Sequence, residues 1–237
     1  MPVAIATFGG MPAEFTDDQL LLELLERRGV ETTYAPWDDP GVDWSSFPLV
    51  FAKSPWDYTT RHAEFLAWAE RVGERLENKP AVIRWNADKR YLGDLQQAGV
   101  PVVPTTYVGP GEAAPAIEGE VVIKPTVSAG ARDTGRFSPR SAREGRELVD
   151  RITAGGGIAM VQPFLEAVER CGETAVVTID GEVSHVLRKR PVLRADEIAP
   201  IRGDALGVAE SMYDPNLVGP GAAGADELQL ARAVLGA

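Results

Sequence analysis

Cysteine and long apolar runs are nearly absent from this sequence. Cys171 is the lone cysteine among 237 residues, which excludes an internal disulfide framework and a cysteine-rich zinc site. No apolar run is long enough to span a bilayer, and no basic segment precedes a short apolar one at the N-terminus. Neither a transmembrane helix nor an export signal is therefore predicted. We expect a cytoplasmic protein without a membrane partner.

Positive charge is also scarce. The 24 Lys and Arg residues are outnumbered by 35 Asp and Glu residues, and the formal net charge is −11. This balance disfavours general electrostatic binding to nucleic acid. Lys occurs only at positions 53, 79, 89, 124 and 189. Because a compact ammonium and a planar guanidinium bind phosphate differently, these positions either mark places where the type of cation matters or are scattered by chance.

The first part of the chain alternates predicted strands with predicted helices. The length allows one large domain or two small ones, and 44% apolar with 25% charged residues is typical of globular proteins. Strands are predicted over 3–8, 30–35, 49–53 and 81–84. Helices are predicted from N-cap residues at 16–18, Thr16 first, to a stop at Gly29, and over 60–76. This alternation predicts an α/β domain with a parallel sheet.

The later part of the chain has a different pattern. Asn86 is predicted to cap a helix over 87–98, after which Pro101 and Pro104 give an extended connector. The further predicted elements are strands at 120–124, 159–163, 176–179 and 183–187 and helices at 141–153 and 226–235. Asp180-Gly181 is a strong hairpin-turn signal, and residues 191–224 are predicted to be irregular. We place one domain at 1–105 and a second, α+β domain at 106–237.

Residues 121–131 contain the strongest indication of chemistry. Their sequence is VVIKPTVSAGA, an apolar strand that ends in Lys124 and continues into a loop of small residues. Small residues let main-chain N–H groups approach phosphate oxygens, and the lysine supplies a point charge. The segment is not a Walker A loop, because the order Gly-x4-Gly-Lys-Ser/Thr is absent. An edge strand with an ordinary surface loop is the alternative interpretation.

The predicted hairpin places three cations together at the end of a strand. A two-residue turn at Asp180-Gly181 pairs Ile179 with Glu182, Glu173 with Arg188, and Cys171 with Arg190. Strand alternation then puts Arg188 and Arg190 on one face and Lys189 on the other. This arrangement suits either a phosphate or carboxylate clamp or a solvated strand edge.

Several segments, in this order, resemble the ATP-grasp family. Residues 86–92 (NADKRYL) and 99–105 (GVPVVPT) resemble the beginning of its ATP-binding domain, and 161–166 (VQPFLE) resembles its hinge strand. Residues 172–191 resemble the hairpin that follows. Near the N-terminus, 37–40 (WDDP) and 53–58 (KSPWDY) resemble the pre-ATP-grasp domain.

Within the family, the chain is most similar to the glutathione-synthetase and ribosomal-modification-ligase subgroup, near the cycloserine-forming cyclo-ligases. The resemblance implies a parallel-sheet pre-ATP-grasp domain followed by an incomplete ATP-grasp fold. Trp56 and Tyr58 come at the carboxyl end of the third predicted strand, where ligands collect in open α/β sheets. Core packing beneath a loop is the alternative for both.

The resemblance also implies roles for individual residues. The implied nucleotide-binding residues are Lys89, Lys124, Ser128, Ala129, Gly130, Gln162, Leu165, Glu166 and Glu173. Both lysines would contact the phosphates, and residues 128–131 would form a lid. The main chain of Gln162 and Leu165 would read adenine, and Glu166 or Glu173 would bind the ribose. The implied catalytic residues, which would stabilise the transferring phosphate, are Arg188 and Arg190.

The family's chemistry predicts an ATP-dependent carboxylate–amine (or similar) ligase that acts through an acyl phosphate. It implies ATP and Mg²⁺, together with small-molecule carboxylate and amine substrates, and leaves homo-oligomer formation open. The family's metal ligands follow the helix predicted near Asp226, and this sequence ends at Ala237. The metal ligands are therefore unassigned, because Asp204, Glu210 and Asp214 lie in a segment of the wrong character. A nucleotide-binding module without ligase activity, or an α/β protein whose basic hairpin binds an acidic partner, are the alternatives.

Overall fold

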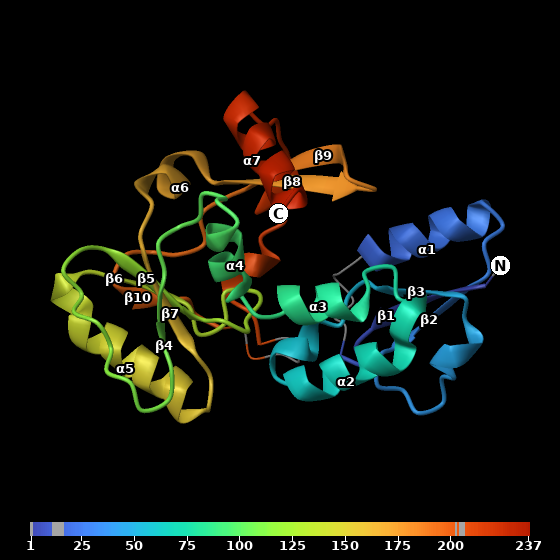
Figure 1. Ribbon diagram of the computed structural model, residues 1–237, viewed down its shortest axis with the longest axis horizontal. Coiled ribbons are helices and arrows are strands. Elements are labelled where there is room, and N and C mark those ends of the chain that lie inside the picture. The colour runs from blue at the N-terminus through green and yellow to red at the C-terminus, as the bar shows by residue number, and fades with distance from the viewer. Residues whose placement is uncertain (1, 11–16, 202, 204–206) are drawn as a thin grey trace. The chain divides into compact units, whose positions relative to one another are not determined.

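The computed structural model describes residues 2–10, 17–201, 203 and 207–237, which form two compact units (Figure 1). Unit 1 consists of Met1–Asp88 and Gly203–Gly207, and unit 2 consists of Lys89–Arg202 and Val208–Ala237. The predicted cap Thr16 and the carboxylate of Asp204 lie outside the described residues. Packing thus divides the chain between Asp88 and Lys89, and the domain boundary after residue 105 stays a prediction.

Unit 1 contains a three-stranded parallel sheet in the order β2-β1-β3. Its elements are β1 (Val3–Thr7), α1 (Asp17–Arg27), β2 (Thr32–Pro36), η1 (Trp44–Ser46), β3 (Leu49–Ala52), η2 (Trp56–Thr59), α2 (His62–Val72), η3 (Gly73–Arg75) and α3 (Pro80–Asn86). The central strand β1 is buried along its whole length, which matches the apolar run from Val3 to Ala6. The first three predicted strands and first two predicted helices are confirmed.

The fourth predicted strand is wrong. Residues 81–84 lie inside helix α3, and Asn86 ends this helix rather than capping the next one. Short apolar runs do not distinguish strand from helix by periodicity. Pro80 occupies the first turn of α3, where its fixed φ and missing N–H favour the start of a helix.

An aromatic cluster connects the two N-terminal motifs. The indole of Trp37, only 2% exposed, donates from Nε1 to Asp57 Oδ1 at 2.8 Å. The ring of Tyr58 packs 5.7 Å from that of Phe65, and the guanidinium of Arg61 lies 4.5 Å from the centre of the Trp37 ring. The 37–40 and 53–58 motifs therefore hold each other within unit 1, which favours the packing interpretation for Tyr58.

Unit 2 contains two antiparallel sheets. The elements are α4 (Tyr91–Gln97), β4 (Thr106–Val108), β5 (Val121–Pro125), β6 (Gly135–Phe137), η4 (Pro139–Ser141), α5 (Ala142–Ala154), β7 (Ala159–Pro163), α6 (Glu166–Cys171), β8 (Glu173–Ile179), β9 (Glu182–Lys189), β10 (Glu197–Ile198), η5 (Glu210–Tyr213), β11 (Val218–Pro220) and α7 (Ala225–Leu235). One sheet has the order β10-β6-β5-β7-β4 and the other has the order β11-β9-β8.

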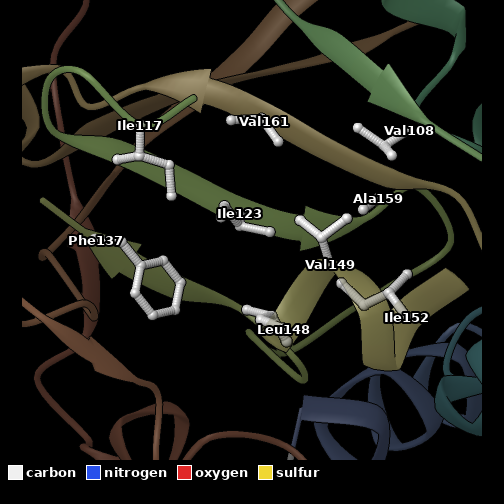
Figure 2. Close-up of a cluster of buried hydrophobic side chains, with 9 residues drawn as sticks. All are labelled: Val108, Ile117, Ile123, Phe137, Leu148, Val149, Ile152, Ala159 and Val161. Carbon is white, nitrogen blue, oxygen red and sulfur yellow. The ribbon is translucent and has the colours of Figure 1, made fainter. Parts of the chain in front are cut away.

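The core of unit 2 lies between helix α5 and the five-stranded sheet (Figure 2). Leu148, Val149 and Ile152 project from α5 toward Ile123 of β5 and its neighbours. Gly145 brings the helix close to the sheet, because a Cβ atom there would lie 2.6 Å from Ile117 Cδ1. This core fixes β5 and β7, whose ends carry several predicted site residues.

A β-bulge changes the predicted register of the hairpin. The turn has positive φ values at Asp180 and Gly181, and Ile179 pairs with Glu182 as predicted. The register shifts between Val177 and Thr178, since an extra residue in one strand displaces every later pair. Glu173 therefore pairs with Lys189, and the predicted pairing of Glu173 with Arg188 is wrong.

Residues 191–224 contain more structure than the sequence predicted. Strand β10 pairs with β6, and β11 pairs with β9, although the segment is rich in Gly, Pro and Ala. The helix predicted at 226–235 is confirmed as α7, which lies against the β8–β9 hairpin (Figure 1). No helix of the described residues is long and apolar enough to cross a membrane.

Candidate functional site

Unit 2 contains a cavity of about 470 Å³ at the ends of β5, β7 and β9. Eight of the nine predicted nucleotide-binding residues line it: Lys89, Lys124, Ser128, Ala129, Gly130, Gln162, Leu165 and Glu173. Its charged lining consists of Lys89, Lys124, Lys189 and Glu173. Three of the chain's five lysines therefore meet at one cavity, and the described residues add a single carboxylate to its lining.

Lys89 fastens the small-residue loop that follows β5. Its Nζ donates to the Ser128 main-chain oxygen at 2.6 Å and contacts Ser128 Oγ at 3.0 Å. Its main-chain N–H donates to Thr126 O at 3.0 Å. The ammonium thus lies at the start of the loop, where it can bind an anion held by the loop's N–H groups.

Lys124 extends from β5 into the cavity. Burial lowers the pKa of its ammonium, the Glu173 carboxylate opposes that shift, and the charge of Lys189 adds to it. Among the described residues, no hydrogen bond or ion pair engages this ammonium. A cation desolvated without a partner is costly in the free protein, and a bound anion would relieve that cost.

Lys189 and Glu173 form the side of the cavity that the hairpin provides. Lys189 Nζ lies 3.9 Å from Glu173 Oε2, at the outer limit of an ion pair, and the two residues are cross-strand partners. The sequence placed Lys189 on the face away from its predicted clamp. The bulge brings it into the cavity, and no signal in the sequence reveals a bulge at this position.

The small-residue loop adopts a conformation that depends on its glycine. Gly130 has a φ of 61°, and a Cβ atom added to it would overlap the side chain of Val208. Ala209 donates its main-chain N–H to Gly130 O at 2.7 Å. The predicted lid residues are therefore held from outside by the 208–209 segment of the same unit.

The exit from β7 supplies the remaining predicted residues. Gln162 is 7% exposed, and its side chain donates to Thr105 Oγ1 at 2.8 Å. The main-chain oxygen of Leu165 accepts from Val168 N at 2.9 Å. Within the described part of the chain, the N–H of Leu165 has no hydrogen-bond partner, so it is available to a ligand.

Three predicted residues do not line the cavity. Glu166 is exposed at the start of α6, which leaves Glu173 as the predicted ribose carboxylate that the cavity contains. Arg188 Nη1 donates to Thr174 Oγ1 at 2.6 Å and Nη2 to Ala222 O at 3.3 Å, which directs it toward the N-terminus of α7. Arg190 is exposed beyond the end of β9. Catalytic roles for both arginines stay predictions.

Apolar side chains form a further part of the cavity wall, and the sequence did not predict a role for them. They are Val103, Val122, Phe164, Val168, Val192 and Leu193. Phe164 lies within the recognised hinge segment and could have been included with its neighbours. Val192 and Leu193 could not, because they belong to the segment that was predicted to be irregular.

Unit 1 contains a second cluster of charged and polar groups, at the carboxyl ends of its strands. Tyr34 donates its hydroxyl to Asp18 Oδ2 at 2.7 Å, and Ser54 also donates to this carboxylate. Lys53 Nζ lies 3.2 Å from Asp18 Oδ1. Burial alone would raise the pKa of Asp18, but the hydrogen bonds and the charge of Lys53 outweigh it and lower the pKa from 3.8. Every group in this cluster has a partner.

No group of three or more His, Cys, Asp or Glu side chains suited to a metal ion occurs among the described residues. Among the described residues that line the cavity, Glu173 is the one carboxylate. Mg²⁺ usually binds through one or two carboxylates, phosphate oxygens and water. The described residues thus do not define a protein-only metal site, and we assign no step to a metal ion.

Sequence comparison connects the chain with DcsG proteins. Residues 3–78 match the family described as D-cycloserine synthetase DcsG, N-terminal domain. The cycloserine biosynthesis protein DcsG of Streptomyces lavendulae is 39% identical over 188 residues, which cover 74% of this chain and 63% of that protein. The chain therefore spans less than two thirds of the length of this curated relative.

Structural comparison extends the match to the whole chain. The crystal structure of D-cycloserine synthetase DcsG has a TM-score of 0.82 and 33% identity, covering 100% of this chain and 80% of that one. D-alanine–D-alanine ligase from Bacillus anthracis has a TM-score of 0.61 and 9% identity, covering 100% and 77%. A structure of that ligase complexed with ATP has a TM-score of 0.52 and 10% identity, covering 80% and 66%. The similarity to this second enzyme concerns the fold alone.

The structural comparisons give the chain the fold of the ATP-grasp ligases, as the resemblance predicted. The mixed α/β fold class is confirmed as well. Within these ligases, the chain belongs to the D-cycloserine synthetase DcsG family.

Proposed function

We propose that the cavity of unit 2 binds ATP and that the chain is part of an ATP-dependent carboxylate–amine (or similar) ligase. The observation that carries this proposal is the meeting of Lys89, Lys124 and Lys189 at one cavity in a protein of net charge −11. An acidic protein that binds a polyanion must concentrate its cations locally. The names of the DcsG relatives and the ATP complex of the ligase with the same fold support this choice.

The residues present suit each part of the nucleotide. Lys89 and Lys124 would bind the phosphates, with Lys189 beside them, and the loop at 128–130 would contribute main-chain N–H groups. The unpartnered N–H of Leu165 would donate to the base between apolar walls. Glu173 would accept from the ribose hydroxyls or, paired with Lys189, adjust the charge near the phosphates.

The proposed reaction follows from these placements. A substrate carboxylate would attack the terminal phosphate to give an acyl phosphate and ADP, and an amine or similar nucleophile would then displace phosphate. The lysines would neutralise the charge that develops on the transferring group, which is the main catalytic contribution in phosphoryl transfer. Mg²⁺ would be carried by the phosphates. The names of the relatives make D-cycloserine the first product to examine.

A thermal-shift experiment with ATP, ADP and GTP tests the binding part of the proposal. A ligand that binds only the folded state stabilises it by about 2.7 kcal/mol at a hundredfold excess over its Kd. We expect ATP and ADP to raise the melting temperature of the protein. Unchanged melting with all three nucleotides at millimolar concentration would contradict nucleotide binding.

Turnover separates a ligase from a nucleotide-binding module. ADP release that requires both Mg²⁺ and a carboxylate substrate is expected of the ligase. ATP binding without such release, across a panel of small amino-acid carboxylates, would favour the module instead. D-cycloserine serves as a product probe, because a ligase of this type should show slower ADP release in its presence.

A further inference from the structure

Arg136 lies buried next to one wall of the cavity without lining it. It belongs to β6, and the residue is only 6% exposed. Its Nη2 donates to Glu120 Oε2 at 2.5 Å and its Nε to the same oxygen at 3.0 Å, while Nη1 donates to Glu169 Oε1 at 3.3 Å. The guanidinium carbon lies 3.5 Å from the centre of the Phe164 ring. One side chain thus contacts two carboxylates and an aromatic face.

These contacts tie three segments to one another. Glu120 directly precedes β5, Glu169 lies in α6, and Phe164 joins the end of β7 to the start of α6. The Phe164 N–H also donates to Glu120 O at 2.9 Å. The segment that leaves β7 is therefore fixed through its main chain and through its aromatic ring.

The fixed segment is the part of the cavity that would meet the nucleobase. Phe164 and Leu165 both line the cavity, and the N–H of Leu165 is available within the described part of the chain. A donor can discriminate between bases only if it cannot move away from a wrong one. Adenine presents a ring-nitrogen acceptor at its N1 position, whereas guanine presents an N–H donor there.

We propose that Arg136 is a positioning residue that sets the base specificity of the cavity by holding Phe164 and, through it, the N–H of Leu165. This inference rests on the proposed function, because it requires a nucleotide in the cavity. Arginine suits the task because its flat guanidinium stacks on a ring while its N–H groups bind carboxylates at the edge. A lysine at this position would keep the charge and lose the stacking plane.

Three variants separate positioning from general stability: Arg136→Lys, Arg136→Met and Phe164→Leu. The parent and each variant are titrated by calorimetry with ATP, GTP and inorganic tripolyphosphate. Tripolyphosphate reports on the proposed phosphate contacts, the lysines and the 128–130 loop, without the base, so it detects damage to that part of the cavity. Arg143→Met is the matched control, because the Arg143 side chain is 75% exposed on α5.

We expect Arg136→Lys and Phe164→Leu each to weaken ATP binding by about fivefold to thirtyfold, the range of a desolvated cation–π contact. Tripolyphosphate affinity should be unchanged, and the preference for ATP over GTP should shrink. Arg136→Met should lose more than Arg136→Lys, because it also leaves two carboxylates unpaired. The double variant Arg136→Lys with Phe164→Leu should be no weaker than either single variant, since both remove the same contact.

Two results would overturn this inference. One is an equal loss of ATP and tripolyphosphate affinity in the folded variants, which would indicate general damage. The other is unchanged ATP and GTP affinity in Phe164→Leu, the variant that keeps the buried ion pairs even if Arg136→Met does not fold. A parent protein that does not bind ATP would overturn the proposed function itself, and this inference with it.

Discussion

The two units each bring lysine and carboxylate side chains together, and they do so with opposite results. In unit 1, Asp18 accepts from Tyr34 and Ser54 and pairs with Lys53 at 3.2 Å. In unit 2, Lys189 and Glu173 are 3.9 Å apart, and the Lys124 ammonium has no hydrogen bond or ion pair to any described residue. The first cluster is closed and satisfied, whereas the second is open and has an excess of cations.

From this difference we expect the unit 1 cluster to serve folding and the proposed site in unit 2 to serve binding. A buried charge with all of its partners stabilises the native state relative to the state in which one partner is missing. A partly buried charge without partners lowers stability in the free protein and gains a partner only when a ligand arrives. The pKa shifts agree with this view. The pKa of Asp18 is lowered, which favours its charged form, and the pKa of Lys124 is lowered, which favours its neutral form.

The largest effect is expected for Asp18→Ala, which breaks the satisfied cluster. The change removes the carboxylate that the Tyr34 and Ser54 hydroxyls and the Lys53 ammonium share, and leaves Thr7 Oγ1 as the remaining partner of the two hydroxyls. We expect it to reduce the free energy of unfolding by about 3 kcal/mol. Urea unfolding at pH 7 followed by tryptophan fluorescence measures this loss. All five Trp residues lie within the first 88 positions, so the signal reports on unit 1.

Asp17→Ala is the matched control for this prediction. Asp17 is the neighbouring residue in the same helical turn, and it is exposed, so its loss should cost about 0.5 kcal/mol or less. Equal costs for the two variants would show that the Asp18 cluster contributes no more than an ordinary surface carboxylate. The conclusion that the unit 1 cluster serves folding would then be wrong.

The second effect concerns Lys124→Ala, which removes the unpartnered cation. We expect ATP binding to weaken by about 1.5–3 kcal/mol, the contribution of one charge-assisted hydrogen bond. Stability should be unchanged or higher, because a desolvated charge has been removed. Lys124→Arg should also bind less well, since its fork is larger and planar. Calorimetric titration with ATP measures the difference, and the exposed Lys79→Ala is the control. ATP affinity equal to that of the parent in Lys124→Ala would show that Lys124 does not bind the nucleotide.

A smaller effect is expected for Lys189→Ala, which tests the corrected register. Lys189 is partly exposed and already paired with Glu173, so solvent and the carboxylate both weaken its attraction for phosphate. We expect a loss of about 1 kcal/mol in ATP binding. Arg190→Ala, at the next position but outside the cavity, should bind ATP like the parent. The reverse order of effects would favour the arginine clamp that the sequence predicted.

Much of the site could be predicted because strand ends and loops of small residues leave a local signal. Lys124 and residues 128–130 follow one another directly, and the Lys89 segment was recognised by its order relative to them. The register of the hairpin could not be predicted in the same way. Counting strand pairs from the turn assumes that each residue of one strand pairs with one residue of the other. The bulge between Val177 and Thr178 adds an unpaired residue and shifts every later pair.

The fold was predictable where length and flanking residues agreed, and it failed where they conflicted. The strand predicted at 81–84 has an apolar sequence but too few residues to reveal its period, and Pro80 starts a helix there instead. Residues 191–224 are rich in Gly, Pro and Ala and show little periodicity, which predicts an irregular segment, and their strands are short and pair with distant partners. Only tertiary contacts, such as β10 with β6, give those residues a strand conformation.

The smallest effect is a pH dependence of ATP binding that comes from Lys124. Burial lowers the pKa of this group from 10.5, with Lys189 adding to the shift and Glu173 opposing it. The phosphates of ATP would favour the charged form and raise the pKa again, so binding takes up a proton between the lowered pKa and the ordinary one. ATP affinity should therefore fall as pH rises through this alkaline window, by less than tenfold per pH unit because one group is involved.

The stability of the free protein should change in the opposite direction and rise with pH. Its unfolded state binds more protons in the same window, so the cost of burying the charge is fully present below the lowered pKa and is relieved as pH approaches 10.5. Calorimetric titrations of the parent and of Lys124→Arg at several alkaline pH values measure this slope. Arginine stays charged throughout, so its profile should be flat, and identical slopes in both proteins would assign the proton to another group.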